Sequence, residues 1–161
     1  MPQSVIMENN PQRKMIRVKG FDYSTERPYF ITICAKDKEP YFLNRNLNHL
    51  IIKQLLEQKK TANFKIFVYC LMPNHLHLLL APTVERISIS NFVGAFKSKT
   101  SRLAWNFGIS GKLWQKRFYD HIVRKREDLE IIGQYILNNP VKQTLVSKWQ
   151  DYEFLGMPDS W

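Results

Sequence analysis

The stretch Tyr69-Cys-Leu-Met-Pro-Asn-His-Leu-His-Leu-Leu-Leu80 holds the pattern on which both the fold and the chemistry of this chain depend. Successive side chains on a strand point to opposite faces of a sheet, so His75 and His77 share one face and the leucines beside them share the other. Same-face neighbours lie roughly 6–7 Å apart, which allows two imidazoles to converge on one metal ion. The pair alone is a weak signal, and two solvated or hydrogen-bonded histidines are the alternative.

The residues around this stretch predict an antiparallel hairpin. Residues 64–71 are almost continuously apolar, and the turn-forming pair Pro73-Asn74 separates them from a second strand over residues 75–81. The run Tyr29-Phe-Ile-Thr-Ile-Cys-Ala35 predicts another strand. Residues 112–123 predict a strand followed by an extended segment.

Three further segments have the apolar spacing of amphipathic helices. They cover residues 48–60, from 88 or 90 to about 107, and from about 127 to 138 or 139, where Pro140 follows. The resulting order is strand, helix, strand, strand, helix, strand, helix. This order predicts an α+β fold, in which helices back an antiparallel sheet.

The length and composition favour one folded domain over residues 1–161. The chain is 44% hydrophobic, and residues 1–12 are polar with two prolines, which predicts a loose N-terminal segment. No apolar run approaches the roughly 20 residues of a membrane span, and no secretory signal is visible. Cys34 and Cys70 lie in apolar runs without metal-type spacing. We therefore expect a cytoplasmic protein without a membrane partner.

The charge indicates a polyanionic partner. Lys and Arg number 24 against 14 Asp and Glu, a formal net charge of +10. Phosphate contacts with basic side chains release condensed counterions, so this excess favours nucleic-acid binding, although a basic protein without such a partner is the alternative. Between Trp105 and Arg124, aromatic and basic residues alternate in the mixture that stacks unpaired bases. The DNA contacts expected are Trp114, Lys116, Arg117 and Arg124, with Arg13, Lys14, Arg17 and Lys19 on an N-terminal arm.

Two of these assignments have structural alternatives. Trp114 and Phe118 are four residues apart and could belong partly to the core. In the last helix, Tyr135 lies beside the apolar stripe, where it could simply be an amphipathic tyrosine at the edge of the core. Residues four apart share a helical face, so Tyr135 is next to Asn139 if the helix continues to its end.

Three ordered blocks resemble a known family. They are Val68-Tyr-Cys-Leu-Met-Pro-Asn-His-Leu-His77, Leu113-Trp-Gln-Lys-Arg-Phe-Tyr-Asp-His-Ile-Val-Arg124 and Tyr135-Ile-Leu-Asn-Asn-Pro-Val-Lys142. Together they resemble the single-tyrosine HUH transposases, and among these the REP-associated tyrosine transposase group. The resemblance covers residues 13–149 and implies a ferredoxin- or RRM-like HUH fold, with the histidines on a central strand and the tyrosine on a C-terminal helix.

The resemblance also implies a site. His75 and His77 would bind a divalent metal, Tyr135 would be the nucleophile, and Asn139 would be the third protein ligand. Two imidazoles and an amide suit Mg²⁺ or Mn²⁺. His121 belongs to a matching block, and we expect it either near the site as a supporting residue or in a structural role.

The expected reaction is metal-dependent cleavage and strand transfer of single-stranded DNA through a 5′-phosphotyrosine intermediate. The resemblance implies a substrate of hairpin-forming, palindromic repeat DNA, acted on by a monomer or a homodimer. Two alternatives stay open from the sequence. One is a non-catalytic nucleic-acid-binding module on an RRM-like sheet, and the other is a domesticated nickase that processes repeats in its host.

Overall fold

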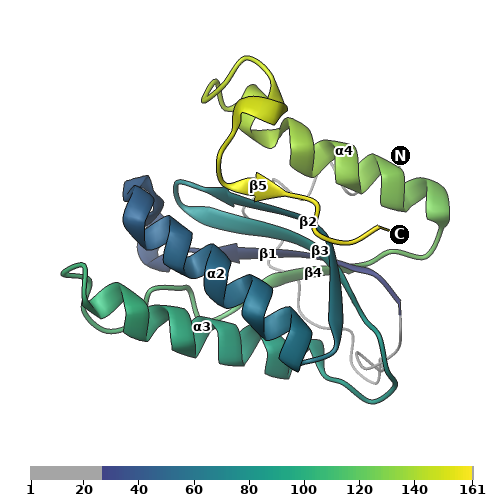
Figure 1. Cartoon of the computed structure of the whole chain (residues 1–161), viewed down its shortest axis with the longest axis horizontal. Coiled ribbons are helices and arrows are strands. Elements are labelled where there is room, and N and C mark those ends of the chain that lie inside the picture. The colour runs from purple at the N-terminus through teal and green to yellow at the C-terminus, as the bar shows by residue number, and fades with distance from the viewer. Residues whose placement is uncertain (1–26, 161) are drawn as a thin grey trace.

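The computed structural model describes residues 27–160, and there one antiparallel sheet lies between two helical layers (Figure 1). Helix α4 covers one face of the sheet, and helices α2 and α3 cover the other. The elements are β1 (Tyr29–Cys34), the 3₁₀ turns η1 (Lys36–Lys38) and η2 (Tyr41–Leu43), α2 (Arg45–Thr61), β2 (Phe64–Met72), β3 (His75–Pro82), α3 (Ile89–Trp105), β4 (Tyr119–Ile122), α4 (Arg126–Lys142), η3 (Trp149–Asp151) and β5 (Leu155–Gly156). The predicted α+β class is confirmed.

The histidines lie on the central strand of this sheet, as predicted. The strand order is β4-β1-β3-β2-β5, and the β2–β3 hairpin pairs antiparallel around the turn at Pro73 and Asn74. In the register of β1 and β3, His77 lies opposite Thr32 and His75 opposite Cys34. Directly paired residues point to the same face of a sheet, so these four side chains share the face that α4 covers.

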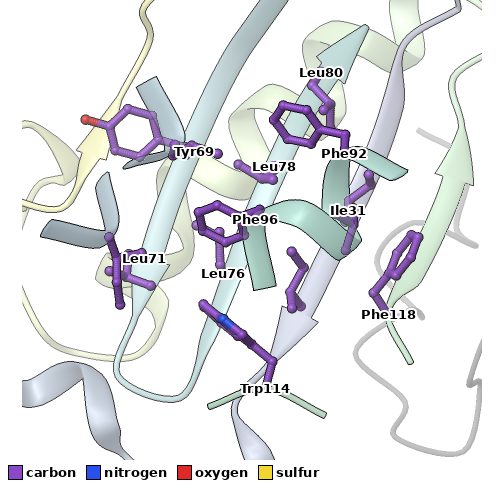
Figure 2. Packing of buried hydrophobic residues seen from close by; sticks show 14 of the residues in the cluster. Ile31, Tyr69, Leu71, Leu76, Leu78, Leu80, Phe92, Phe96, Trp114 and Phe118 are labelled. Carbon is purple, nitrogen blue, oxygen red and sulfur yellow. The ribbon is translucent and has the colours of Figure 1, made fainter. Parts of the chain in front are cut away.

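The face toward α2 and α3 is a continuous apolar core. Figure 2 shows Leu76 and Leu78 of β3 packed with Ile31 of β1 and with Phe92 and Phe96 of α3. All five are buried. A second buried cluster lies under α4, where the predicted stripe of Leu129, Ile132 and Ile136 packs against the sheet. Each histidine of β3 is thus held by a strand whose alternate residues are fixed in the larger core.

Helix α4 extends beyond its predicted end. We expected it to stop at 138 or 139 because Pro140 follows, but it continues to Lys142 with Pro140 inside. Proline removes one hydrogen bond to the preceding turn and leaves its own carbonyl available. Here the Gln143 N–H donates to the Asn139 carbonyl at 3.0 Å and the Leu145 N–H to the Pro140 carbonyl at 2.9 Å, which completes the last turn.

The segment between α3 and α4 also differs from the prediction. The regular strand is β4 at its end, whereas residues 112–118 cross the end of β1 without forming a strand of their own. The Gln115 N–H donates to the Cys34 carbonyl at 2.8 Å, and the Lys36 N–H to the Leu113 carbonyl at 2.9 Å. These few bonds satisfy the backbone where β1 ends. The short strand β5, which pairs with the edge of β2, was not predicted because two residues give no periodic signal.

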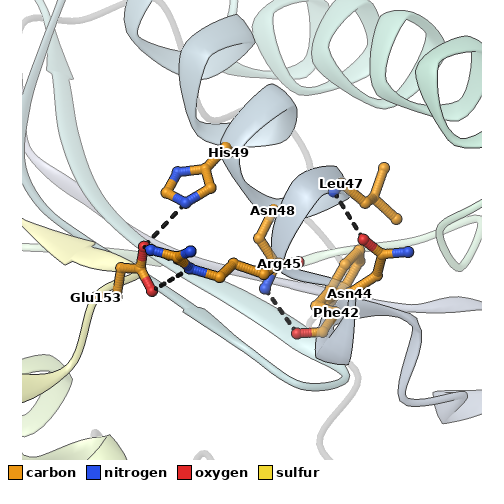
Figure 3. A network of polar contacts seen from close by, with 7 residues as sticks. All are labelled: Phe42, Asn44, Arg45, Leu47, Asn48, His49 and Glu153. Carbon is orange, nitrogen blue, oxygen red and sulfur yellow. Dashed lines mark hydrogen bonds and ion pairs between the residues drawn. The ribbon is translucent and has the colours of Figure 1, made fainter.

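Helix α2 begins three residues earlier than predicted because Asn44 caps it. The Asn44 side chain accepts a hydrogen bond from the Leu47 N–H at 3.1 Å, as Figure 3 shows. In the same network the Arg45 guanidinium donates to both carboxylate oxygens of Glu153 at 2.7–3.0 Å. Arg45 and Glu153 are exposed, so their ion pair adds little stability, but it joins α2 to the C-terminal segment.

Candidate metal and nucleophile site

The two histidines of β3 converge on each other. His75 Nε2 lies 3.1 Å from His77 Nε2, and the ring centroids are 4.6 Å apart. His77 is only 3% exposed, and His75 is half-buried. Alternation along the strand places both rings under α4, and the apolar residues on the opposite face fix the strand that holds them.

The outer ring nitrogens have fixed partners. His75 Nδ1 lies 2.7 Å from Asn74 Oδ1, and because an amide oxygen only accepts, Nδ1 of His75 holds the proton and its Nε2 presents a lone pair. His77 Nδ1 lies 2.9 Å from Thr32 Oγ1. A hydroxyl can donate or accept, so Thr32 permits either tautomer of His77. With the proton on Nδ1, both histidines present Nε2 lone pairs to the same point.

Burial keeps both rings neutral. It lowers the pKa of His75 to about 4, and burial together with the nearby His75 lowers the pKa of His77 well below its usual value. Neutral imidazole is the form that binds metal ions. At neutral pH the pair is therefore ready to act as a ligand pair and not as a pair of cations.

Asn139 places an amide beside these rings. It lies one helical turn after Tyr135 on α4 and is 4% exposed. Its interaction with His75 opposes the effect of burial by raising the pKa of that ring. Its Oδ1 atom is buried and, within residues 27–160, has no hydrogen-bond partner. An unsatisfied buried acceptor costs free energy, and a proton or a divalent cation between this oxygen and the histidine pair would satisfy it.

The donor set fits a divalent metal. With metal–ligand distances of about 2.1 Å, two ligands at right angles are about 3.0 Å apart, close to the separation of the two Nε2 atoms. In the part of the chain that the structure describes, no group of three or more His, Cys, Asp or Glu residues is arranged so that it could hold a metal ion. A site of two imidazoles and one amide leaves coordination positions for water or substrate oxygens, as catalytic sites do.

Tyr135 lies next to the histidine pair. Its ring centroid is 5.8 Å from that of His77 and 5.9 Å from that of Phe30, with edge-on geometry in both contacts. Tyr135, His75 and His77 line one cavity of about 690 Å³. Tyr135 packs at the edge of the core, which was the structural alternative for this residue. The same position places it at the cavity. The aromatic packing fixes its ring beside the candidate ligands.

The predicted DNA-binding residues occupy different places. Lys116 and Arg117 are exposed and line a second cavity of about 450 Å³, and Arg124 is exposed after β4. Trp114 is only 2% exposed, and its Nε1 donates to Thr100 Oγ1 at 2.8 Å. In this structure it is a core residue, the alternative that its spacing from Phe118 left open. Arg13, Lys14, Arg17 and Lys19, like the segment 1–12, lie outside the described residues.

His121 lies on the same face of the sheet as the candidate ligands but does not line their cavity. It pairs with Phe30 in the register of β1 and β4, whereas Tyr119 pairs with Thr32. The row across the sheet is therefore Tyr119, Thr32 and His77, and Tyr119 does line the cavity.

Sequence reasoning missed two residues that orient the histidines. Thr32 could have been identified from the alternation of β1, because it shares a face with Phe30 and interrupts an apolar strand. Asn74 looked like an ordinary turn former, and nothing in the sequence showed that its amide would bond the ring of the next residue.

The comparisons with known proteins agree with the geometry. Residues 24–139 match the family model described as "Transposase IS200 like", so the chain belongs to the IS200-like transposase family. A REP-associated tyrosine transposase of Escherichia coli is 25% identical over 130 residues, which cover 78% of this chain and 73% of that protein. An uncharacterized protein of Haemophilus influenzae is 30% identical over 160 residues, which cover 80% of this chain and 88% of that protein.

Solved structures show the same fold. A REP-associated tyrosine transposase bound to a REP hairpin superimposes with a TM-score of 0.74 at 21% identity, covering 88% of this chain and 82% of that one. A transposase-like protein of Deinococcus radiodurans superimposes with a TM-score of 0.53, covering 77% of this chain and 97% of that one. Among residues 27–160, none of the helices is both long and apolar enough to cross a membrane.

Proposed function

We propose that this chain cleaves single-stranded DNA with Tyr135 as the nucleophile and rejoins the strand ends, using a divalent metal held by His75, His77 and Asn139. The observation that supports this most directly is the meeting of two features at one cavity, a pair of neutral imidazoles and a tyrosine on the covering helix. The side chain of Asn139 on the same helix interacts with His75, and within residues 27–160 its buried amide oxygen has no hydrogen-bond partner. Membership of the IS200-like transposase family supports DNA processing as the general activity.

The nucleophile, the residues that position it and the metal would have different roles in the reaction. A free tyrosine has a pKa near 10 and is a poor nucleophile at neutral pH, so positioning must supply much of its reactivity. Phe30 and His77 hold the Tyr135 ring at the wall of the cavity where the scissile phosphate would lie. A divalent ion, Mg²⁺ or Mn²⁺, would act as a Lewis acid on the phosphate oxygens.

The covalent step balances without an external energy source. The Tyr135 hydroxyl loses its proton as its oxygen forms a bond to the phosphorus, the bond from phosphorus to the 3′ oxygen of the preceding nucleotide breaks, and that oxygen takes up a proton, so no proton is gained or lost overall. The phosphodiester energy is kept in the 5′-phosphotyrosine, so a 3′ hydroxyl can reverse the reaction with a new strand. Cleavage and strand transfer are then the same step run in two directions.

The proposed substrate is a hairpin with an unpaired flank. A tyrosine on the flank of α4 reaches a phosphate more easily in a single strand than inside a duplex. The second cavity, with Lys116 and Arg117, shares Gln115 and Tyr119 with the first, so a basic surface continues directly from the site. The related structure bound to a REP hairpin favours a palindromic repeat as the natural target.

A non-catalytic module that binds bases on its open sheet is less compatible with this structure. Such modules stack bases on aromatic side chains of the sheet surface. Here α4 packs on the face that holds the histidines, and α2 and α3 pack on the other face. The site is a cavity beneath a helix, which suits one phosphate group better than a row of stacked bases.

A covalent-adduct assay tests the proposal. A hairpin oligonucleotide with a single-stranded flank, labelled at its 3′ end, should become attached to the wild-type protein with Mg²⁺ or Mn²⁺ and remain attached through denaturing electrophoresis. Tyr135→Phe removes one hydroxyl and should abolish the adduct while the melting temperature and DNA affinity stay near wild type. Tyr119→Phe is the matched control, because its ring lines the same cavity. An adduct that persists in Tyr135→Phe and disappears in Tyr119→Phe would assign the nucleophile to Tyr119.

A further inference from the structure

A separate groove lies between α3 and residues 111–116, on the side of the sheet away from α4. It has a volume of about 620 Å³, and Trp105, Arg102 and Lys112 are among the residues that line it. Helix α3 covers the face of the sheet opposite to α4, as Figure 1 shows. The small residues Gly94 and Ser98 also line the groove, and the space beside Gly94 is open.

Trp105 gives this groove an exposed aromatic surface. Its side chain is 53% exposed, in contrast to the buried Trp114. The Trp105 Nε1–H donates to the Gly111 carbonyl at 2.8 Å, which fixes one edge of the ring against the loop that follows α3. A ring that is anchored at its edge and exposed over half its surface can stack on a planar ligand without losing much conformational freedom.

The charge of the groove indicates an anionic ligand. Lys97, Arg102, Lys112 and Lys116 line it, and its lining includes no Asp or Glu. Lys97 donates to the Lys116 carbonyl at 3.0 Å, so part of this charge also holds the loop in place. Aromatic stacking with several cations and no carboxylate is the composition of surfaces that bind single-stranded nucleic acid.

The groove is continuous with the candidate site. It shares Lys112 and Lys116 with the second cavity, and that cavity shares Tyr119 with the cavity of Tyr135. The connection follows residues 112–119, which cross the end of β1 through the Gln115 N–H bond to the Cys34 carbonyl. A strand that leaves the site can therefore pass around the end of the sheet and reach α3 over a basic surface.

We infer that the groove at Trp105 is a second subsite for single-stranded DNA, which binds an unpaired flank of the substrate some distance from the cleaved phosphate. This inference rests on the proposed function and adds a role for the face away from the histidines. Trp105 stacks one base, and Arg102 and Lys112 contact the phosphates beside it. A duplex stem cannot stack a base on Trp105, because its bases are already stacked on each other.

Binding measurements on the full-length protein test the inference. With EDTA present to prevent cleavage, the affinity for hairpins with single-stranded flanks of increasing length is measured by fluorescence anisotropy. Trp105→Leu should lower the affinity for long flanks by about tenfold and leave that for the shortest flank unchanged, since one stacked base is lost. Trp105→Phe retains a stacking ring and loses the bond to Gly111, so it should stay close to wild type.

A charge series provides an independent readout. Lys112→Gln should reduce the slope of log affinity against log salt by about 0.7 for long flanks. Lys53→Gln is the matched control, because Lys53 is exposed on α2 and lines none of the three cavities. Photocrosslinking of a flank that contains 5-iodouracil should attach it to Trp105, as mass spectrometry of the digested adduct would show.

The possible outcomes separate this inference from the proposed function. Equal affinities of Trp105→Leu and wild type at every flank length, or equal competition by a blunt duplex, would overturn the second subsite. An adduct at Tyr135 in the wild-type protein would still support the proposed function in that case. Absence of any adduct together with the expected length dependence would instead overturn the proposed catalysis and keep the DNA-binding groove.

Discussion

The two faces of strand β3 differ in what their side chains do. Leu76, Leu78 and Leu80 point toward α2 and α3 and are completely buried in apolar contacts. His75 and His77 point toward α4 and contact polar groups at the edge of a cavity. Alternation along this strand thus places the residues that stabilise the core on one face and the residues of the proposed site on the other. A polar site can be built in the sheet without interrupting the larger core.

The α4 face is itself divided along its length. Toward one end, Phe30 and Leu79 pack with Leu129 and Ile132 of the helix in a second apolar cluster. Toward the other end, Thr32 lies opposite His77 and bonds its ring. Because buried apolar residues hold α4 against the sheet, Tyr135 and Asn139 are placed beside the two histidines. The helix therefore acts as a fixed support for the proposed nucleophile.

The largest difference between the faces should appear when adjacent residues of β3 are truncated. Leu78→Ala opens a cavity in the main core and should lower the free energy of unfolding by about 2–5 kcal/mol. His77→Ala removes a desolvated ring next to a water-accessible cavity and should cost less than about 1 kcal/mol, while adduct formation is lost. Chemical denaturation gives both free energies.

The adduct assay supplies the other half of this test. Measured below its melting temperature, Leu78→Ala should still form the adduct, and His77→Ala should not. Equal destabilisation by the two substitutions, or normal cleavage by His77→Ala, would show that the two faces are not divided in this way.

A somewhat smaller effect is expected from acid. Burial lowers the pKa of His75 to about 4 in the folded protein, against an ordinary value near 6.5. Between pH 6.5 and pH 4 the His75 ring is therefore protonated in the unfolded chain but not in the folded chain. The folded state loses stability as the pH falls through this range. The shift sets an upper limit of about 3 kcal/mol for this loss at the His75 site.

The measurement compares unfolding free energies at pH 7 and pH 4.5 for the wild type and for His75→Ala. Other groups titrate in both proteins, so the difference between the two pH profiles isolates His75. The wild type should lose more stability on acidification than the variant. Parallel profiles would mean that the ring is protonated in the folded state without cost, in conflict with its buried position.

The sequence predicted most of this fold because its signals were local. The histidines, leucines and turn of the β2–β3 hairpin specify their own register, and Tyr135 and Asn139 are related by one helical turn. The place of Tyr135 at the cavity of the two histidines could be expected only from the family resemblance, since α4 is far from β3 in the sequence. The geometry agrees with that expectation, and their chemical roles stay predictions.

Two features that sequence reasoning missed depend on hydrogen-bond partners outside the patterns used to predict them. Helix α4 continues through Pro140 because the N–H groups of Gln143 and Leu145 donate to the carbonyls of Asn139 and Pro140. The apolar spacing of the helix does not predict these bonds. The burial of Trp114 depends on its bond to Thr100 of α3. Pro140 and Trp114 were judged by their residue type. Backbone bonds at the helix end decided the result for Pro140, and a tertiary partner on α3 decided it for Trp114.

The smallest expected effect concerns Thr32, which orients His77 from the neighbouring strand. Metal binding requires the lone pair of His77 Nε2, so the ring proton must be on Nδ1, where the Thr32 hydroxyl accepts it at 2.9 Å. Thr32→Val has a similar shape but leaves that buried N–H without an acceptor, and Thr32→Ser retains one. We expect the valine variant to bind Mn²⁺ roughly 10-fold more weakly and the serine variant to bind it like wild type. Electron paramagnetic resonance of free Mn²⁺ in titrations without DNA measures this directly. If the valine variant binds Mn²⁺ as tightly as wild type, the hydroxyl of Thr32 does not orient His77 and the proposed tautomer of His77 is wrong.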